Sequence, residues 1–401
     1  MRIAIAGAGI GGLAAACLLA TNGHQIDLFD QFAAPRPIGS GLMIQPMGLH
    51  VLDLCGAGDS VRANGQTIAR MLGHDGARRI LDVRYDPAGR IPRQGTAIHR
   101  ATLHAALLNA TLAHGVTITP AMSVQSAPLH GNQRHLHMTN GTTHGPYDLV
   151  IDATGAGSTL SPLKAHALPY GAIWGTVPWP ETTDLPQNQL TQAYHRASRM
   201  AGVLPLGRVP NRHGPHAAIF WSMPRETLAH WPQTALEDWK AQATTHWPAL
   251  TPFLETLTHT DQMTTATYTH GTLKRPYAPA LAFIGDAAHR ASPQLGQGAN
   301  MALFDALALA RALHQNPLDD ALPRYAQTRR WHVRLYQTLS AVFTPQYQSN
   351  SRILPALRDH ILAPASLTWP MPRVLSRIVA GTLIPPLAGE PAPQIHLGLN
   401  T

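Results

Sequence analysis

The chain begins with closely spaced glycines of a kind that can hold a pyrophosphate. Residues 7–12 read Gly-Ala-Gly-Ile-Gly-Gly, a G-x-G-x-x-G pattern between an expected buried strand at 2–6 and an expected helix at 11–22. The first glycine permits a sharp turn, the second leaves room for the pyrophosphate, and the last lets helix and strand pack closely. The free N–H groups at the helix start then face the phosphates. We predict a dinucleotide site that includes Gly7, Gly9, Gly11 and Gly12.

An acidic residue stands where such a site needs one. Asp30 lies 18 residues after Gly12, at the end of an expected strand at 25–30. A carboxylate there accepts hydrogen bonds from the ribose hydroxyls of the adenosine half, and we place the next residue, Gln31, against the same ligand. A merely structural glycine turn is the alternative, which the flanking strand, helix and acid disfavour. This motif alone does not distinguish FAD from NAD.

A second glycine-rich turn, at 285–300, makes that distinction. An expected strand ends at Gly285-Asp286, and a turn with Pro293 and Gly296 leads into a helix that starts near residue 298. Asp286 can bond a polyol hydroxyl, while the helix start directs N–H donors and partial positive charge at a flavin ring, which favours the anionic reduced flavin. We expect Pro293 and Gly296 near the ring. Five residues here are assigned to the cofactor: Asp286, Gly296, Gly298, Ala299 and Asn300.

The stretch from Gly285 to Asn300 resembles the second FAD motif of the FAD-dependent aromatic hydroxylases, the superfamily of para-hydroxybenzoate hydroxylase and the ubiquinone-biosynthesis hydroxylases. The resemblance extends over most of the chain. It implies a monooxygenase that uses FAD, NADH or NADPH, and O2 to hydroxylate an aromatic or polycyclic small molecule through a flavin C4a-hydroperoxide. Two alternatives stay open. One is a related FAD oxidoreductase (an epoxidase, a Baeyer–Villiger-type oxygenase or a dehydrogenase), and the other is a non-catalytic flavin-dependent ligand-binding protein.

Further residues carry the resemblance outside this motif. Gly39-x-Gly41 and Gln45-Pro46 follow the second strand, and Arg100 opens an expected helix at 100–113. In the family the corresponding arginine approaches the FAD pyrophosphate, and a phosphate partner also suits a cation that otherwise opposes the helix dipole. His289, often found in the family motif, is either a catalytic base or a packed turn residue. We add three residues to the expected FAD contacts: Gly41, Arg100 and Val124.

The segment 153–161 departs from the family pattern. It reads Ala-Thr-Gly-Ala-Gly-Ser-Thr-Leu-Ser, so Thr154 and Ser161 stand where the family carries an aspartate and an arginine, whereas Gly155 and Ser158 are kept. The family uses this segment for FAD binding and for handling NAD(P)H. The identity of the reductant, and direct reduction by a nicotinamide, therefore stay open.

The alternation of expected strands and helices predicts an α/β fold. It comprises a Rossmann-like FAD-binding domain made of residues 1–167 and 276–345, an inserted antiparallel-sheet substrate domain at 168–275, and a helical C-terminal region at 346–401. The inserted sheet is expected to cover the flavin and to form the roof of the substrate site. Its large apolar residues suit either an aromatic pocket or core packing: Trp174, Trp179, Trp221 and Met223.

Composition narrows the choice of partners. Of the 401 residues, 13% are charged, about half the usual share of roughly 25%, and the net charge is +8. Because the basic residues are scattered, dinucleotide phosphates suit them better than nucleic acid. Cys17 and Cys55 have no metal or disulfide spacing, so no metal is expected and a cytoplasmic location fits. No apolar run predicts a membrane span, but the tail at 361–388 can contact a membrane peripherally. A monomer or homodimer is expected.

Overall fold

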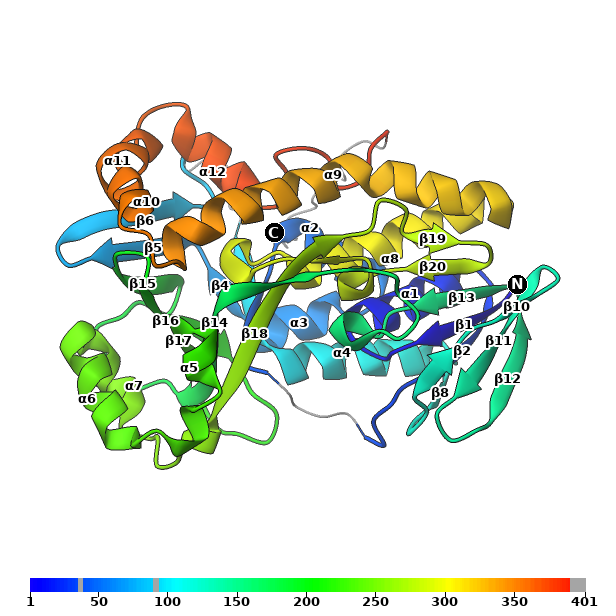
Figure 1. The fold of residues 1–401 in the computed structure, drawn as a ribbon, viewed down its shortest axis with the longest axis horizontal. Helices are drawn as coiled ribbons and strands as arrows, with labels where there is room; N and C mark the ends of the chain where they lie inside the picture. Colours follow the sequence, from blue (N-terminus) through cyan, green and yellow to red (C-terminus); the bar gives the residue numbers. More distant parts are fainter. Residues whose placement is uncertain (35–38, 89–93, 390–401) are drawn as a thin grey trace, which may run out of the picture.

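The computed structural model describes residues 1–34, 39–88 and 94–389, and one of its two large sheets carries the dinucleotide-type topology (Figure 1). Its strands are β1 (Arg2–Ala6), β2 (Gln25–Phe29), β8 (Thr117–Thr119), β13 (Leu149–Asp152), β19 (Tyr277–Ala278) and β20 (Leu281–Phe283). Their order is β19-β20-β13-β1-β2-β8, and every pair is parallel except β19 with β20. The carboxyl ends of β1, β2, β13 and β20 therefore meet at one edge, where ligands of such sheets bind.

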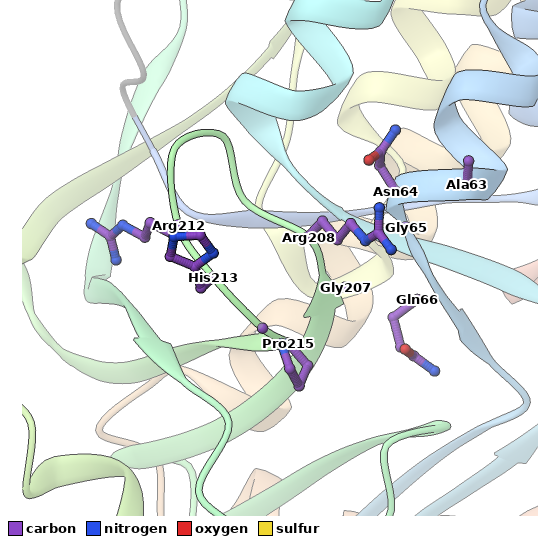
Figure 2. Close-up of a pocket in the computed structure, with 10 residues that line it drawn as sticks. Ala63, Asn64, Gly65, Gln66, Gly207, Arg208, Arg212, His213 and Pro215 are labelled. Atoms are coloured by element: carbon purple, nitrogen blue, oxygen red, sulfur yellow. The ribbon is translucent and has the colours of Figure 1, made fainter.

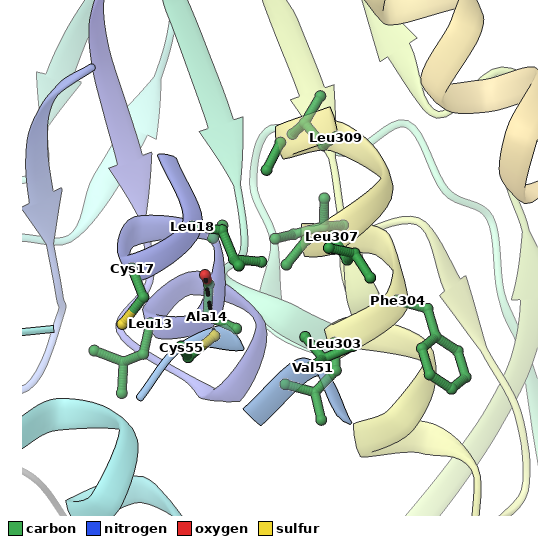
Figure 3. Close-up of a cluster of buried hydrophobic side chains, with 14 of the residues drawn as sticks. Leu13, Ala14, Cys17, Leu18, Val51, Cys55, Leu303, Phe304, Leu307 and Leu309 are labelled. Carbon is green, nitrogen blue, oxygen red and sulfur yellow. Dashed lines mark hydrogen bonds between the residues drawn. The ribbon is translucent and has the colours of Figure 1, made fainter. Parts of the chain in front are cut away.

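Three helices pack on this sheet and bring the two glycine-rich turns together. They are α1 (Ile10–Thr21), α4 (Arg100–Ala113) and α8 (Gly298–Gln315). Leu13 and Cys17 of α1 lie in the same buried apolar cluster as Leu303 of α8 (Figure 3). A Cβ placed on Gly11 would lie 3.2 Å from the Cβ of Ala302, and one placed on Gly285 would lie 3.1 Å from it. This close approach sets both helix starts at the same edge of the sheet.

The second large sheet has eight strands: β5 (Arg70–Asp75), β6 (Arg78–Arg84), β14 (His166–Pro178), β15 (Gln189–His195), β16 (Arg199–Gly207), β17 (His216–Pro224), β18 (Met263–Thr272) and β21 (His289–Arg290). Their order is β21-β18-β14-β17-β16-β15-β5-β6, antiparallel except for β15 with β5. The sequence pattern of the inserted segment predicts strands at 169–177, 199–206, 216–223 and 262–273. They correspond to β14, β16, β17 and β18, whereas the pattern does not predict β15. The sheet also takes in β5 and β6, from residues assigned to the FAD-binding domain. The domain boundaries themselves stay a prediction.

The two faces of this sheet have different surroundings. Trp221 and Met223 point into a cluster under three short helices, α5 (Arg225–Leu228), α6 (Leu236–His246) and α7 (Thr251–Leu254), and Trp179 packs against the same cluster. For these three residues the core-packing alternative holds. Trp174 lies on the opposite face, where its ring centroid is 4.6 Å from that of Phe220. Strand alternation separates Trp221 from Phe220, because neighbouring residues of a strand point to opposite faces.

The long helix α9 (Leu318–Tyr347) ties the two sheets together (Figure 1). Near its start the hydroxyl of Tyr325 donates to the carbonyl of Phe283 on β20, at 2.8 Å. At its end the ring of Tyr347 lies 5.3 Å from that of Tyr194 on β15. The expected helical C-terminal region follows as α10 (Ile353–Leu357), α11 (Ala363–Ser366) and α12 (Met371–Val379). The last residues, 390–401, lie outside the described part of the chain.

Smaller elements complete the fold around the first sheet. A three-stranded sheet contains β3 (Gly41–Ile44), β4 (Gln66–Ile68) and β7 (Gly95–His99), and the helices α2 (Pro46–Leu54) and α3 (Gly58–Asn64) lie between its first two strands in the chain. A four-stranded sheet contains β9 (Val124–Ser126), β10 (Leu129–His130), β11 (Gln133–Met138) and β12 (Thr143–Tyr147). The sequence pattern predicts a single strand at 115–128; the structure has two strands there, β8 and β9, in different sheets.

Candidate active site

The first glycine turn is built so that no side chain fits in it. Gly7 has a φ of +100°, and a Cβ there would lie 2.6 Å from the carbonyl oxygen of Ala153. A Cβ on Gly12 would lie 1.9 Å from the carbonyl oxygen of Gly7. Real Cβ atoms do not approach backbone atoms this closely, so glycine is required at both positions for the turn to close.

Space opens directly in front of this turn. A Cβ on Gly9, Gly155, Gly157 or Gly298 would meet no protein atom within 4 Å. Gly9 precedes α1 and Gly298 begins α8, and neither helix start has a side chain capping it. The N–H groups of both first turns therefore need a partner from outside the helix. Two uncapped helix starts beside open space are the arrangement that a dinucleotide phosphate and a flavin ring require.

Asp30 is held at the end of β2 by the turn itself. Its Oδ2 accepts a hydrogen bond from the backbone N–H of Ala8 at 2.7 Å, and its Oδ1 accepts one from that of Phe32 at 2.9 Å. Each carboxylate oxygen has a second lone pair. The side chain is thus oriented beside the glycine turn with acceptor capacity left for ribose hydroxyls. Gln31 is exposed next to it.

The second glycine turn depends on a buried ionic cluster. Asp305, only 1% exposed, accepts hydrogen bonds from the Gly285 N–H at 2.9 Å, from His289 Nε2 at 2.6 Å and from Arg329 Nε at 2.7 Å. Burial by itself raises the pKa of this carboxyl, but His289 and Arg329 overcome that effect and lower it to about 2. Of the two alternatives for His289, the structure favours the packed turn residue. Its role is to position the turn.

Asp286 lies beside this cluster but points elsewhere. Its side chain is open to solvent, whereas Gly285 before it is buried. Partial exclusion of water by the surrounding protein raises the pKa of the Asp286 carboxyl, and the charges of His289, Arg100 and Arg290 oppose that rise. Arg100 thus acts electrostatically on the second motif although it starts α4, far away in sequence. A carboxylate that is open on one side and enclosed on the others suits the floor of a ligand cleft.

The start of α8 is fixed by a buried amide network. Asn300 donates from Nδ2 to the carbonyls of Met43 at 3.0 Å and Gly296 at 3.2 Å, and its Oδ1 accepts from the Gln45 N–H at 2.8 Å. The Oε1 of Gln45 accepts a hydrogen bond from the Tyr85 hydroxyl at 2.7 Å. Its Nε2 is buried without a partner in the described structure and lies 3.9 Å from a Cβ built on Gly296. Such an unpartnered donor beside the expected flavin turn fits a flavin, and Gln45 is not among the residues that the sequence predicts as cofactor contacts.

The departure from the family pattern also has a structural explanation. Asp152, fully buried at the end of β13, accepts hydrogen bonds at Oδ1 from the Thr154 N–H at 3.0 Å and the Thr154 hydroxyl at 2.6 Å. The Ser158 hydroxyl donates to Oδ2. Burial raises the pKa of Asp152. An aspartate at position 154 would set a second negative charge beside it, so threonine suits this turn.

Two other residues assigned to the cofactor have packing roles. Val124 is buried in a small apolar cluster, and its carbonyl accepts from the Thr159 hydroxyl at 2.9 Å. A Cβ on Gly41 would lie 2.2 Å from Leu206 Cδ2, so its glycine lets β3 pack on the second sheet. Any FAD contact of either residue would involve its backbone. The assignment of individual cofactor contacts stays a prediction, although most of these residues gather around the open space.

The chain matches the model of one protein family over most of its length. Residues 1–335 match the family described as FAD binding domain. The chain belongs to this FAD-binding family. FAD fits the uncapped helix starts, the open glycines and the unpartnered Gln45 amide described above.

Relatives within this FAD-binding family are monooxygenases. The 3-amino-4-hydroxybenzoate 2-monooxygenase of Streptomyces cremeus is 27% identical over 92% of this chain and 94% of its own. The 3-hydroxybenzoate 6-hydroxylase of Polaromonas naphthalenivorans is 25% identical over 80% of each chain. The structure of Klebsiella pneumoniae HpxO complexed with FAD and uric acid has a TM-score of 0.78 at 19% identity, covering 95% of this chain and 97% of that one. The expected fold class, the FAD cofactor and the assignment as a FAD-dependent monooxygenase are thereby confirmed.

Replacing Gly9 by valine is expected to remove FAD without unfolding the protein. The backbone at Gly9 is extended and open, so the side chain fits the apoprotein but fills the space for the pyrophosphate. We expect the Kd for FAD to rise by at least about tenfold, with little change in the melting temperature of the apoprotein. Titration of apoprotein with FAD measures this. Ala77→Val, at an exposed turn, is the control, and an unchanged Kd in Gly9→Val would contradict the placement.

Replacing Asp305 by asparagine is expected to lower the free energy of unfolding by about 3–5 kcal/mol, because Arg329 stays buried without its counter-charge. The pKa of Asp305 is lowered to about 2 from a usual 3.8. Its charge therefore stabilises the fold fully above the usual value, and the difference from the variant shrinks as the pH falls from 4 to 2. Urea unfolding across this pH range checks both points. The exposed Asp184→Asn is the control; a loss of less than 1 kcal/mol at neutral pH would refute the role of the cluster.

Proposed function

We propose that this FAD-dependent monooxygenase hydroxylates a neutral aromatic or polycyclic small molecule, with NADPH or NADH as the reductant. The main support for this proposal is the face of the second sheet that lies next to the turn before α8. On neighbouring strands it presents side chains that do not ionise: Trp174, Phe220, Met200 and Gln192. Gln294 of the turn lies beside them, with its Nε2 3.9 Å from the Met200 sulfur.

Tyr268 on β18 supplies a hydrogen-bonding group on this face. Its hydroxyl oxygen accepts from Trp174 Nε1 at 2.9 Å. Burial raises the pKa of Tyr268 to about 12, and the bond from Trp174 only partly opposes that rise. At neutral pH the phenol therefore keeps a hydrogen that it can donate to an oxygen or nitrogen of the substrate. FAD, when bound, supplies the activation of oxygen, while Trp174 and Phe220 stack on the ring and exclude water.

The chemistry of this face favours an uncharged ring. Names of relatives include both a carboxylated ring, as in 3-hydroxybenzoate 6-hydroxylase, and a quinolone, as in 2-heptyl-3-hydroxy-4(1H)-quinolone synthase of Pseudomonas aeruginosa. Burying a carboxylate requires a cation or several donors. None of the four side chains named for this face is a cation. Arg358, whose guanidinium lies over the Tyr194 ring next to them, is already engaged by Asp359 and by the carbonyl of Gln346. A substrate of the second kind therefore fits better.

The C-terminal helices also support the expected peripheral contact with a membrane. Seven of the thirteen exposed large hydrophobic side chains in the described part of the chain fall within 353–371, and Ile353 and Trp369 are 79% and 78% exposed. We name residues 353–371 the apolar tail patch. Patches of this kind mark interaction sites. Within the described chain no helix is long and apolar enough to cross a bilayer.

The charge around the apolar tail patch favours an anionic lipid surface as its partner. Arg352, Arg373 and Arg377 are exposed at its ends. The one acidic residue between 352 and 379, Asp359, is paired with Arg358 at 2.6 Å. Exposed aromatic and aliphatic side chains with basic neighbours are typical of segments that lie in a membrane interface. A neutral polycyclic substrate would itself partition into such a membrane.

The proposed function is tested by anaerobic titration of the FAD-loaded protein with NADPH and with NADH, followed by admission of O2 with candidate substrates. We expect one nicotinamide to bleach the flavin, and a neutral aromatic compound to be recovered with one added oxygen atom. Bleaching with product lacking added oxygen would indicate a dehydrogenase. Oxygen inserted next to a carbonyl or across a double bond would indicate the related oxygenases. Ligand binding with no reduction by either nicotinamide would indicate a binding protein.

The variant arm of this experiment uses Tyr268→Phe. Loss of one hydrogen bond to the substrate should raise the KM for the substrate roughly fivefold. A larger share of the reduced flavin should then react with O2 to give hydrogen peroxide, while the FAD content stays unchanged. Tyr277→Phe on β19 is the matched control, because the described structure shows no hydrogen bond from its hydroxyl. Equal behaviour of the two variants would remove Tyr268 from the substrate site.

Membrane contact is tested by sedimentation with vesicles. The double variant Ile353→Ser with Trp369→Ala should lose binding to vesicles that contain anionic lipid, because it removes the two most exposed apolar side chains of the apolar tail patch and membrane binding scales with the apolar area that is buried. Trp331→Ala with Val342→Ser, which removes two exposed large apolar side chains from α9 outside the patch, should retain binding. If the first variant changes only the oligomeric state, the patch is a homodimer interface and the membrane proposal fails.

A further inference from the structure

A pocket of about 570 Å³ lies beside the loop that joins β16 to β17. Figure 2 shows Arg208, Arg212 and His213 on this loop, with Arg208 directed toward the end of α3 at Asn64 and Arg212 directed the opposite way. Gln66, which begins β4, also lines the pocket. Its size is within the range of small-molecule sites. None of the residues proposed to bind the substrate ring lines this pocket.

The pocket is positively charged and its charges are unpaired. Arg208 and Arg212 are exposed, and in the described part of the chain no acidic side chain forms an ion pair with either. The one hydrogen bond described for Arg212 runs from Nη1 to the carbonyl of Thr176, at 3.2 Å. Two guanidinium groups with spare donors, and the amides of Asn64 and Gln66, line the same pocket. Guanidinium groups are suited to phosphate oxygens, and each can contact a different part of a phosphorylated ligand.

The same contacts connect the pocket to the FAD cleft. The hydroxyl of Thr176 lies 3.1 Å from that of Ser40, and the Ser40 carbonyl accepts from the backbone N–H of Arg100 at 3.0 Å. The hydroxyl of Thr102, on α4, donates to the carbonyl of Arg208 at 3.1 Å. These contacts connect the pocket to Ser40 and to the start of α4, where the FAD pyrophosphate is expected.

The segment that serves the reductant in the family supplies no cation here. Ser161 stands at the family's arginine position and its hydroxyl donates to the carbonyl of Ala287 at 2.6 Å. Thr154 is bonded to Asp152. Both side chains are thus engaged within the protein. Arg208 and Arg212 offer the charge that these positions lack.

We propose that this pocket binds phosphate groups of the nicotinamide dinucleotide that reduces the flavin, with Arg208 and Arg212 as the phosphate ligands. The inference rests on the proposed function. Two parts of such a dinucleotide are phosphate anions that arginine can bind: the pyrophosphate, which NADH and NADPH both have, and the 2′-phosphate, which only NADPH has. With its phosphates bound there, the adenosine half of the dinucleotide would lie at the protein surface, next to the loop that joins β16 to β17.

The test combines a kinetic and a direct measurement on FAD-loaded protein. Stopped-flow reduction gives the Kd for NADPH and for NADH, and calorimetry gives the Kd for two fragments that cannot reduce flavin, ADP-ribose and 2′,5′-ADP. Arg208→Gln and Arg212→Gln should each raise the Kd for dinucleotide and fragment roughly three- to tenfold, at unchanged substrate affinity. Arg84→Gln, an exposed arginine on β6, is the matched control.

The outcomes separate the pocket from the function. A larger effect with 2′,5′-ADP than with ADP-ribose assigns the 2′-phosphate, and the reverse assigns the pyrophosphate; either supports the proposal. Unchanged Kd values in both variants overturn it while flavin reduction stays intact. If neither nicotinamide reduces the wild type, the proposed function fails. In that case fragment binding that depends on the two arginines still assigns a nucleotide phosphate site, and its absence overturns the pocket as well.

Discussion

The buried carboxylate of Asp305 is the interaction on which the cofactor site depends. It holds the Gly285 N–H at the end of β20, the ring of His289 in the following turn, and the guanidinium of Arg329 on α9. Arg329 also donates to the carbonyl of Pro386, beyond the last helix. A charge this deep is tolerated because every partner is present. One carboxylate therefore couples the position of the flavin turn to the helix that spans both sheets.

A second buried carboxylate explains why this protein differs from its family. Asp152 has its hydrogen bonds supplied by Thr154 and Ser158, so the turn after β13 is satisfied internally. A turn of this kind keeps its backbone shape without offering charge to the cleft. The loss of the usual acid and base at 154 and 161 is thus a consistent local arrangement. Because neither Thr154 nor Ser161 is charged, the proposed binding of an anionic nicotinamide dinucleotide has to depend on other residues at the rim of the cleft.

Site residues could be predicted from the sequence where a short motif determines the residue type. They were missed where a residue's orientation depends on hydrogen-bond partners far away in the sequence. Gly7 and Gly12 were predictable because a Cβ at either would collide with backbone. Gln45 was not assigned, because its orientation depends on Tyr85 and Asn300, 40 and 255 positions away. The strand β15 was missed because its Gln-Leu-Thr-Gln-Ala-Tyr-His sequence alternates poorly. Which tryptophans face the flavin side follows from strand register, which composition does not reveal.

The second sheet separates two kinds of recognition. One face carries Trp174, Phe220 and Met200, and the proposed function has it bind a ring through dispersion and a few hydrogen bonds. The loop at its end carries exposed arginines, which bind anions through charge and are screened by salt. The two surfaces adjoin at Ser40 and Gly41, at the start of β3, where the Ser40 hydroxyl donates to the carbonyl of Gly175 and Gly41 packs against Leu206 without a side chain of its own. Because the forces differ and the residues do not overlap, affinity for the ring and affinity for the anion can change independently, while both depend on the position of these two residues.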